Sequence, residues 1–414
     1  MVTNFLQKFQ LQNNQLVLPK KQLVTYALYA LLALALLHHL LFYPAPAPEK
    51  AVVVPRVQDD VATVVSSQVD APEQLPPPPP VGQKGDEVLV NPQAEAEVSA
   101  PPPPPCDFSD GEWVPDARPP LYNGTSCGTI KDGQNCMAHG RPDTSYLYWR
   151  WHPKGCDLPP FSPDALLRWL RNKHLAFVGD SLARNQAESL MCLLASRSPP
   201  ELVHRDGEEN KRRRWVFRSH NATVSVFWSP FLVNATEKAE RAGVRHNNVF
   251  LDAFDERWMA RVREIDAVVL AVGHWFLIPG VYHDGGVVVA CHDCADLNRT
   301  ETGDWDKSGA CPKKRPYRSG EKELGYTETE MRKTVVEAVA QANAGVGAGS
   351  GLRFAALDVT TLANLRPDGH PGPYMHKDPF AGAGDRVQND CVHWCMPGPV
   401  DTFNEILLQT ILLR

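Results

Sequence analysis

The sequence predicts an α/β fold built on a mostly parallel β-sheet. Apolar runs typical of buried strands occur at Leu175–Val178 and Ala267–Val272, and an alternating run at Thr223–Trp228 predicts another strand. Apolar residues recur at helical spacing over Leu182–Leu194, directly after the first run. Strands that alternate with helices favour a doubly wound sheet.

An uncharged segment near the N-terminus, Leu23–Tyr43, predicts a membrane-spanning helix. Its 21 residues are long enough to cross a bilayer. Three lysines and no acidic residue precede it, so the positive-inside rule places residues 1–22 in the cytosol and the rest of the chain across the membrane. A cleaved signal peptide is the alternative, but its apolar core is usually shorter, and no convincing small-residue cleavage site follows.

The next segment, residues 44–105, is predicted to be a spacer. It holds 16 of the 37 prolines, and such runs favour extended polyproline II and form no packed core. We expect it to hold a folded domain, residues 106–414, away from the membrane. The net charge of -6 argues against a generally basic nucleic-acid binder.

The predicted domain begins with a loop-rich stretch, Cys106–Cys156, that is rich in Cys, Trp, Pro and Gly. Its aromatic residues stand among polar ones, which suits a carbohydrate surface because flat rings stack on sugar C–H faces. A small disulfide-linked core that needs those rings for packing is the alternative. Three residues of this stretch are candidates for substrate binding: Arg141, Asp143 and Trp149.

Further elements follow in an order that fits the α/β prediction. We expect helices at Phe161–Leu170, Glu328–Ala344 and Asp401–Leu413, and one more strand at Arg353–Val359. The last helix carries apolar residues along one side.

All cysteines of the chain follow the spacer, and their even number on the far side of a membrane predicts disulfides. They are Cys106, Cys127, Cys136, Cys156, Cys192, Cys291, Cys294, Cys311, Cys391 and Cys395. Their connectivity stays open. A zinc site at Cys291-His-Asp-Cys294 is the lesser alternative, since thiols in an oxidising compartment more often pair, and we predict no metal. Four Asn-x-Thr acceptors predict N-glycosylation, at Asn123, Asn221, Asn234 and Asn298.

Ser181 is the candidate nucleophile. It follows Gly179-Asp180 between a predicted strand and a predicted helix, so its hydroxyl stands at the carboxyl edge of the sheet, where open α/β folds bind ligands. Amides at the helix N-terminus could stabilise a developing oxyanion. The alternative is that Ser181 merely caps the helix.

Asp390 and His393 are the candidate partners of Ser181. They are three residues apart, so on a helical turn or tight loop they face the same way. The imidazole can take a proton from a hydroxyl, and the carboxylate can fix the tautomer. Cys391 and Cys395 bracket His393, so disulfides could hold this loop rigid. A structural Asp–His hydrogen bond in a Cys-rich loop is the alternative.

The order Ser…Asp-x-x-His resembles the SGNH or GDSL esterase superfamily, whose fold is a three-layer α/β sandwich. The resemblance extends to CDFSDGEWVPD, PLYNGTSC, NCMAHGRPDTSYLYWRW and FVGDSLARNQ. These motifs, with the run from Val387 to Glu405, look like the plant trichome-birefringence-like family of Golgi polysaccharide O-acetyltransferases. With the anchor and spacer included, the resemblance covers nearly the whole chain.

This resemblance implies a catalytic triad of Ser181, Asp390 and His393 that moves acetyl groups onto wall hemicellulose. It also implies a single-pass type II Golgi membrane protein with its catalytic domain in the lumen. No bound cofactor is expected, but an acetyl donor is required, either acetyl-CoA or another acetylated carrier. The segment from Gly273 to Cys294 looks closer to the xyloglucan- and mannan-acetylating branches than to the xylan branch.

The sequence departs from the wider esterase pattern at one position. Those enzymes often place an oxyanion-hole Asn in a Gly-x-Asn loop, whereas the comparable strand here ends in Gly273-His274-Trp275. Asn185, four residues past the nucleophile, is the candidate replacement, together with the Ser181 N–H. Arg184, His274 and Trp275 are further candidates for substrate binding. An acetylesterase, or a non-catalytic polysaccharide binder tethered to the membrane, remain the alternative functions.

Overall fold

The computed structural model describes residues 106–206, 211–238, 244–292, 311, 313–347, 351–381 and 387–413. The predicted membrane helix, the spacer and Asn298 lie outside these ranges. Within them, no helix combines the length and the apolar character that crossing a bilayer requires.

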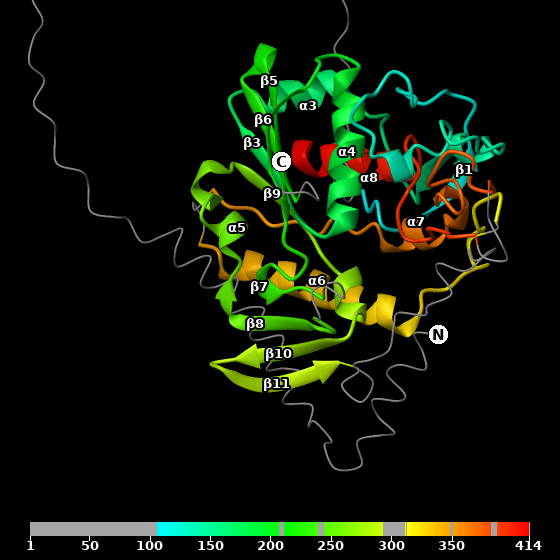
Figure 1. Ribbon diagram of the computed structural model, residues 1–414. Coiled ribbons are helices and arrows are strands. Elements are labelled where there is room, and N and C mark those ends of the chain that lie inside the picture. The colour runs from blue at the N-terminus through cyan, green and yellow to red at the C-terminus, as the bar shows by residue number, and fades with distance from the viewer. Residues whose placement is uncertain are drawn as a thin grey trace, which may run out of the picture. The chain divides into compact units, whose positions relative to one another are not determined.

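A five-stranded sheet forms the centre of the described part, with strand order β4-β5-β6-β3-β9 (Figure 1). The strands are β3 (His174–Gly179), β4 (Glu201–Asp206), β5 (Arg212–Phe217), β6 (Ala222–Trp228) and β9 (Ala267–Ala271). β3 runs parallel to both β6 and β9, whereas β4 and β5 extend the sheet in antiparallel fashion. The strands predicted at Leu175–Val178, Thr223–Trp228 and Ala267–Val272 are confirmed. The predicted parallel arrangement is correct for β6, β3 and β9, which carry the candidate nucleophile, and wrong for β4 and β5.

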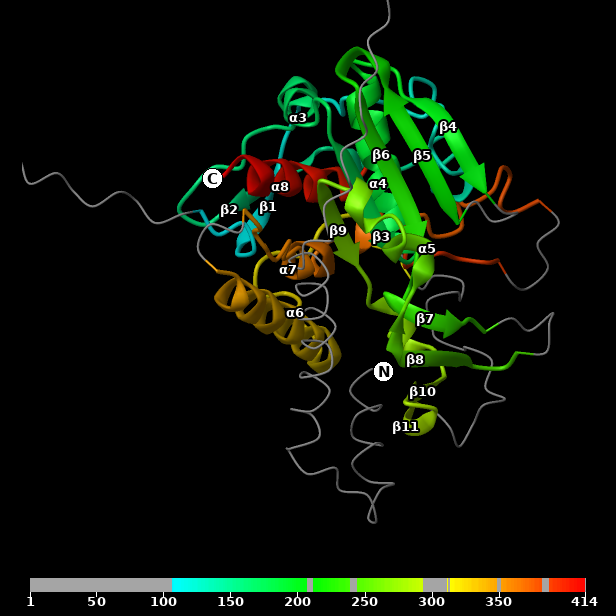
Figure 2. The ribbon, with the colours of Figure 1, turned by 90° about the vertical axis from the view of Figure 1, so that its left-hand side faces the viewer.

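The sheet is covered mainly on one face. α3 (Pro163–Trp169), α4 (Ser181–Ala195) and α8 (Val400–Leu412) pack there and form the main core (Figure 2). A smaller cluster, which joins Trp258 of α5 (Glu256–Met259) to β3 and β6, lies against the other face. Every residue of β3 is buried, as expected for a strand that is covered on both sides. The expected three-layer sandwich is therefore present only in part in the described residues. One face of the sheet carries a full helical layer, and the other carries only the small cluster around α5.

The remaining elements extend this frame. β1 (Gly111–Pro115) pairs with β2 (Trp149–Pro153) in a two-stranded sheet. A second sheet, in the order β11-β10-β8-β7, contains β7 (Val233–Thr236), β8 (Asn247–Phe254), β10 (Gly280–Asp284) and β11 (Val287–His292). Short 3-10 helices occur at Asp132–Gln134, Ser145–Leu147, Arg218–His220, Val262–Glu264, His274–Leu277 and Pro367–Gly369.

The predicted helices are confirmed, but one predicted strand is wrong. α6 (Tyr326–Gly345) covers the predicted helix in the middle of the chain, whereas Arg353–Val359 forms no strand. Asp358 precedes α7 (Thr360–Asn364) and accepts the N–H of its first residue, Thr360, at 3.2 Å. The apolar residues of the segment, Leu357 and Val359, pack against the main core from a loop. These apolar residues therefore reach the core without belonging to a strand.

Disulfides tie the N-terminal lobe, residues 106–157, to the sheet domain. Four are described: Cys106–Cys156, Cys127–Cys192, Cys136–Cys395 and Cys311–Cys391. Cys291 is disulfide-bonded as well, and Cys294 lies outside the described residues. The predicted disulfides are thus present, and two of the bonds leave the lobe to join α4 and the C-terminal loop.

Two carboxyl groups of α8, Asp401 and Glu405, lie mostly inside the protein. Burial raises the pKa of Asp401 to about 6, although its carboxyl accepts hydrogen bonds from Ser189 and Tyr122. Burial raises the pKa of Glu405 to about 7; the nearby Asp401 adds to this rise and Arg118 opposes it. The last helix therefore carries acids that keep their protons more readily than exposed ones do.

Glu405→Gln should stabilise the protein at about pH 8 and change little at about pH 5. The folded pKa of about 7 exceeds the usual 4.5, so the stability that this carboxyl contributes is full at low pH and is lost as the pH rises through about 7. Removing the charge should raise the free energy of unfolding at about pH 8 by on the order of 1 kcal/mol. Thermal denaturation at both pH values measures this effect. Glu112→Gln, on the exposed side of β1, is the control, and an equal gain there would contradict the prediction.

Candidate active site

The carboxyl ends of the three parallel strands lie together at one edge of the sheet. β3 leads into Asp180 and Ser181, β6 into Ser229, and β9 into Gly273-His274-Trp275. Backbone bonds hold these ends together: Ser229 N–H donates to Gly179 O at 2.8 Å, and Asp180 N–H donates to Ala271 O at 3.3 Å. In α/β sheets this edge is where ligands bind.

Ser181 is the first residue of α4, directly after a turn that needs glycine. A Cβ atom at Gly179 would lie 1.8 Å from the Ala271 carbonyl oxygen, so no other residue fits there. Asp180 caps the helix by accepting the Leu182 N–H at 2.9 Å. Capping is therefore the role of Asp180, and within the described part no hydrogen bond occupies either the amide or the hydroxyl of Ser181. An unpaired amide at a helix N-terminus suits an oxyanion.

Asp390 and His393 form the predicted pair in a tight loop. The His393 Nδ1–H donates to Asp390 Oδ2 at 2.7 Å, and Asp390 Oδ1 accepts the backbone N–H groups of Val392 and His393 at 2.9 and 3.0 Å. Burial pushes the pKa of Asp390 up, but the hydrogen bond and charge of His393 outweigh it, so the pKa falls to about 2. With Nδ1 as donor, Nε2 carries the lone pair of a neutral ring and can act as a base.

The Nε2 atom of His393 is buried and has no hydrogen-bond partner among the described residues. No hydrogen bond joins it to the Ser181 hydroxyl in this structure. The two residues are linked through Asn185 of α4, the helix that Ser181 begins, because Asn185 bonds the backbone of Trp394, the residue after His393. Burial is the larger influence on the Asp180 pKa and raises it, while the charges of His274 and His393 lower it. Hydrogen bonds between a nucleophile and its base are often long before substrate binds.

Asn185 connects α4 to the loop that carries His393. Its Oδ1 accepts the Trp394 N–H at 2.7 Å, and its Nδ2 donates to the Trp394 carbonyl at 3.4 Å. Asn185 lies about one helical turn after Ser181, on the same side of α4. Its side chain is fully buried, and its amide bonds the backbone beside the candidate base. That it donates to the oxyanion stays a prediction.

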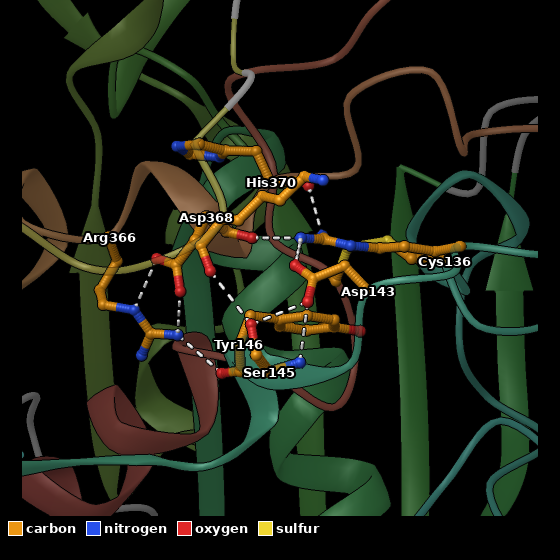
Figure 3. A network of polar contacts seen from close by, with 10 residues as sticks. Cys136, Asp143, Ser145, Tyr146, Arg366, Asp368 and His370 are labelled. Carbon is orange, nitrogen blue, oxygen red and sulfur yellow. Dashed lines mark hydrogen bonds and ion pairs between the residues drawn. A yellow bond between two sulfur atoms is a disulfide. The ribbon is translucent and has the colours of Figure 1, made fainter. Parts of the chain in front are cut away.

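A network of polar contacts supports the same loop from the N-terminal lobe (Figure 3). The Arg141 guanidinium donates to the carbonyls of His370 and Asp368 at 2.8 and 2.5 Å and lies 4.0 Å from the centre of the Tyr146 ring. His370 in turn donates from Nδ1 to the His393 carbonyl at 2.7 Å. Arg141 is thus connected to His393 through two successive hydrogen bonds, by way of His370.

These contacts give Arg141 and Asp143 partners within the protein, and their role in substrate binding stays a prediction. Arg141 is only 8% exposed, and its donors are directed at internal carbonyls. Asp143 accepts both the amide and the hydroxyl of Ser145, at 3.0 and 2.7 Å. Trp149 lies on β2 and packs against the main core.

Both disulfides predicted to restrain the base loop are present. Cys391 is bonded to Cys311 and Cys395 to Cys136, so a cross-link lies on each side of His393. The loop therefore has little freedom to carry its imidazole away from Asp390.

The other predicted substrate-binding residues gather beside Ser181. The Arg184 guanidinium lies 5.5 Å from the centre of the Trp228 ring, and the Trp228 and Trp275 rings meet edge to face at 5.4 Å. His274 is close enough to lower the pKa of Asp180 by its charge. Aromatic and charged groups from β6, α4 and the 3-10 helix His274–Leu277 thus form one side of the candidate site.

Sequence reasoning missed two residues that the structure brings next to the base. His370 stacks on Trp394, with ring centres 4.3 Å apart, and burial lowers the pKa of His370. Trp394 directly follows His393 within the run from Val387 to Glu405, and this adjacency could have placed it next to the candidate base. His370 lies between a glycine and a proline with no periodic pattern around it, so only the fold reveals its place.

Comparison with known families agrees with this geometry. The profile of the PC-Esterase family, described as a GDSL/SGNH-like acyl-esterase family found in Pmr5 and Cas1p, matches residues 158–302 and 295–410. The profile of the PMR5 N-terminal domain matches residues 104–157, the lobe that carries Arg141. The chain therefore belongs to the PC-Esterase family of GDSL/SGNH-like proteins.

Several relatives carry more particular names. The chain is 55% identical to xyloglucan O-acetyltransferase 2 of Populus trichocarpa, over 74% of this chain and 82% of the relative. It is 48% identical to xyloglucan O-acetyltransferase 1 of Arabidopsis thaliana, over 74% and 80%. Protein trichome birefringence-like 26 of Arabidopsis thaliana is 38% identical, over 75% and 78%. The resemblance to the trichome-birefringence-like family is thus confirmed.

Asp390→Asn should lower the rate of acetyl transfer from an activated acetyl ester by roughly 10³- to 10⁴-fold, the scale seen when a triad carboxylate is neutralised. The amide can present its NH₂ group to His393 and so favour the tautomer whose Nε2 is protonated and cannot act as base. Release of p-nitrophenol from p-nitrophenyl acetate measures the rate. Asp206→Asn on β4 is the exposed control, and full activity of the Asp390 variant would exclude its role.

Proposed function

We propose that this protein transfers acetyl groups onto sugar hydroxyls of plant hemicellulose, with xyloglucan as the favoured acceptor. One observation carries the proposal: a hydrogen-bonded Asp390–His393 pair keeps a buried, unpaired Nε2 and is joined through Asn185 to the helix that begins at Ser181. Relatives that are 48–55% identical and named xyloglucan O-acetyltransferases support the acceptor class.

The proposed reaction is a double displacement. His393 Nε2 takes the proton of the Ser181 hydroxyl, and Ser181 Oγ attacks the acetyl carbonyl of the donor. The tetrahedral oxyanion accepts a hydrogen bond from the Ser181 N–H at the start of α4; one such donor typically stabilises the transition state by about 2.7–4 kcal/mol. The bond to the donor breaks, the leaving group takes the proton from His393, and acetyl-serine remains.

In the second half, a sugar hydroxyl replaces the donor. His393 takes its proton, the sugar oxygen attacks the acetyl-serine carbonyl, and Ser181 leaves and recovers the proton. Asp390, whose pKa is about 2, stays ionised throughout and stabilises the imidazolium of both halves. The donor is acetyl-CoA or another acetylated carrier.

The same triad would also serve an acetylesterase, in which water replaces the sugar. A transferase must place an acceptor hydroxyl better than it places water. We assign that task to the side of the site formed by Arg184, His274 and Trp275. The second aromatic ring there, Trp228, favours a sugar acceptor because rings offer apolar faces to sugar C–H groups. Acetate release without transfer to a glycan would select the esterase.

The remaining proposals concern topology. We propose that residues 23–43 anchor the protein in the Golgi membrane, that residues 1–22 stay in the cytosol, and that residues 44–105 hold the domain in the lumen. The disulfides support an oxidising compartment. Three sequon residues, Asn123, Asn221 and Asn234, are exposed and open to glycans. Digestion of residues 106–414 by protease added outside sealed Golgi vesicles would contradict this orientation.

Ser181→Ala should abolish formation of an acetyl-protein intermediate. The variant lacks the oxygen that forms the ester, so the tryptic peptide that contains residue 181 should gain no acetyl mass after incubation with acetyl donor. Transfer to xyloglucan oligosaccharides should be lost with it. Ser219→Ala, an exposed serine away from the site, should behave like the wild type. Undiminished transfer by the Ser181 variant would end the triad proposal.

Trp275→Ala should raise KM for the acceptor oligosaccharide by roughly 3- to 10-fold, with a smaller change in kcat, because one ring contact contributes about 0.5–1.5 kcal/mol. Initial rates over a series of xyloglucan, mannan and xylan oligosaccharides measure both constants. Tyr326→Ala removes an exposed ring of α6 and serves as the control. An unchanged KM would remove Trp275 from the acceptor side.

A further inference from the structure

We propose that Asn185 is a positioning residue that holds His393 at the separation from Ser181 that proton transfer requires. This inference rests on the proposed acetyl transfer and assigns Asn185 no contact with substrate. It starts from the way one side-chain amide binds both backbone groups of Trp394, the residue after the base.

The carboxamide of Asn185 pairs with both backbone groups of Trp394, as a residue of a neighbouring β-strand would. Its oxygen accepts the Trp394 N–H at 2.7 Å while its nitrogen donates to the Trp394 carbonyl at 3.4 Å. A single group with an acceptor and a donor side by side is needed for this pairing, and only Asn and Gln side chains supply it. The side chain is 0% exposed, so no water competes for these bonds.

The helix to which Asn185 belongs is itself fixed. Gln186 donates from its side chain to Asn404 of α8 at 3.4 Å, and Asn404 donates back to the Gln186 carbonyl at 3.1 Å. Asn404 also donates to the hydroxyl of Ser189 at 2.9 Å. Because α4 cannot shift on the core, a contact with α4 defines a position relative to Ser181.

The other restraints on the base loop lead elsewhere. The disulfides join Cys391 to Cys311 and Cys395 to Cys136, outside α4, and the His370–His393 bond leads to the Arg141 network. Among the described residues, the hydrogen bonds of Asn185 are those that join this loop directly to the nucleophile helix. Asn185 therefore sets the distance between the His393 ring and Ser181. The disulfides and the His370 bond limit the motion of the loop without tying it to α4.

The rival role, an oxyanion-hole donor, makes a different kinetic prediction. An oxyanion donor stabilises the transition state whether or not His393 is present, whereas a positioning residue has nothing to position once the imidazole is gone. A double-mutant cycle between Asn185 and His393 therefore separates the two roles.

The experiment measures the rate of Ser181 acetylation by p-nitrophenyl acetate in the full-length protein and in Asn185→Ala, His393→Ala and the double variant. We expect Asn185→Ala to slow acetylation by roughly 10²-fold, the scale of a displacement of about 1 Å. The double variant should equal His393→Ala within about twofold. Added imidazole should restore part of the activity of both His393→Ala proteins to the same rate.

Two outcomes overturn the inference. Wild-type rates for Asn185→Ala would do so, and so would a double variant that is roughly 10²- to 10³-fold slower than His393→Ala, which would mark an oxyanion donor. Full activity of His393→Ala would instead refute the proposed triad, so the two failures are distinguishable.

Two further variants address folding. Gln186→Ala removes one side-chain bond to α8, while the bonds from Asn404 to the Gln186 carbonyl and to Ser189 still hold α4. It should therefore lower the melting temperature while leaving the acetylation rate near that of the wild type. If Asn185→Ala does not fold, Asn185→Asp takes its place in the cycle. The carboxylate keeps the acceptor for Trp394 N–H and loses the donor, so we expect an intermediate rate.

Discussion

The position of the loop that carries Asp390 and His393 is the constraint on which the rest of the structure depends. An imidazole works as a base toward a hydroxyl only when its unprotonated nitrogen is held in place and left unpaired. The loop meets both conditions, because Asp390 occupies Nδ1 and Nε2 stays without a partner among the described residues. A disulfide at Cys395 and the buried Asn185 hold this loop directly, and the buried Arg141 holds the neighbouring turn from which His370 bonds the His393 carbonyl.

The N-terminal lobe helps to hold this loop in position. Its aromatic and charged residues suit a carbohydrate surface by type, yet Arg141 uses its donors to hold the 368–370 turn. The Cys136–Cys395 bond joins positions that are 259 residues apart. The lobe is thus bonded directly to the loop of the proposed base, and the proposed acceptor side is formed by residues of β6, α4 and the 3-10 helix His274–Leu277.

Buried polar groups are costly unless each finds a partner, and a satisfied network then favours one arrangement. Arg366 illustrates this: it is 1% exposed, pairs with Asp368 at 2.8 Å and lies 4.3 Å from the centre of the Trp113 ring. Asp368 offers its carbonyl to Arg141. The ion pair therefore supports the turn from which His370 reaches the base.

The sequence by itself determined the strand–turn–helix around Ser181, the Asp390–His393 pair and the helices, because local periodicity and short spacing encode these features. It failed for Arg353–Val359, where partly buried apolar residues pack against the core from a loop. It also did not give the partners of Arg141, Asp143 and Asn185, because a polar residue type does not say which way its side chain points. Only the tertiary structure decided those directions. Hydrogen-bond partners such as Asn185 and Trp394 are 209 residues apart, and no local pattern records a contact made by the packing of a helix against a distant loop.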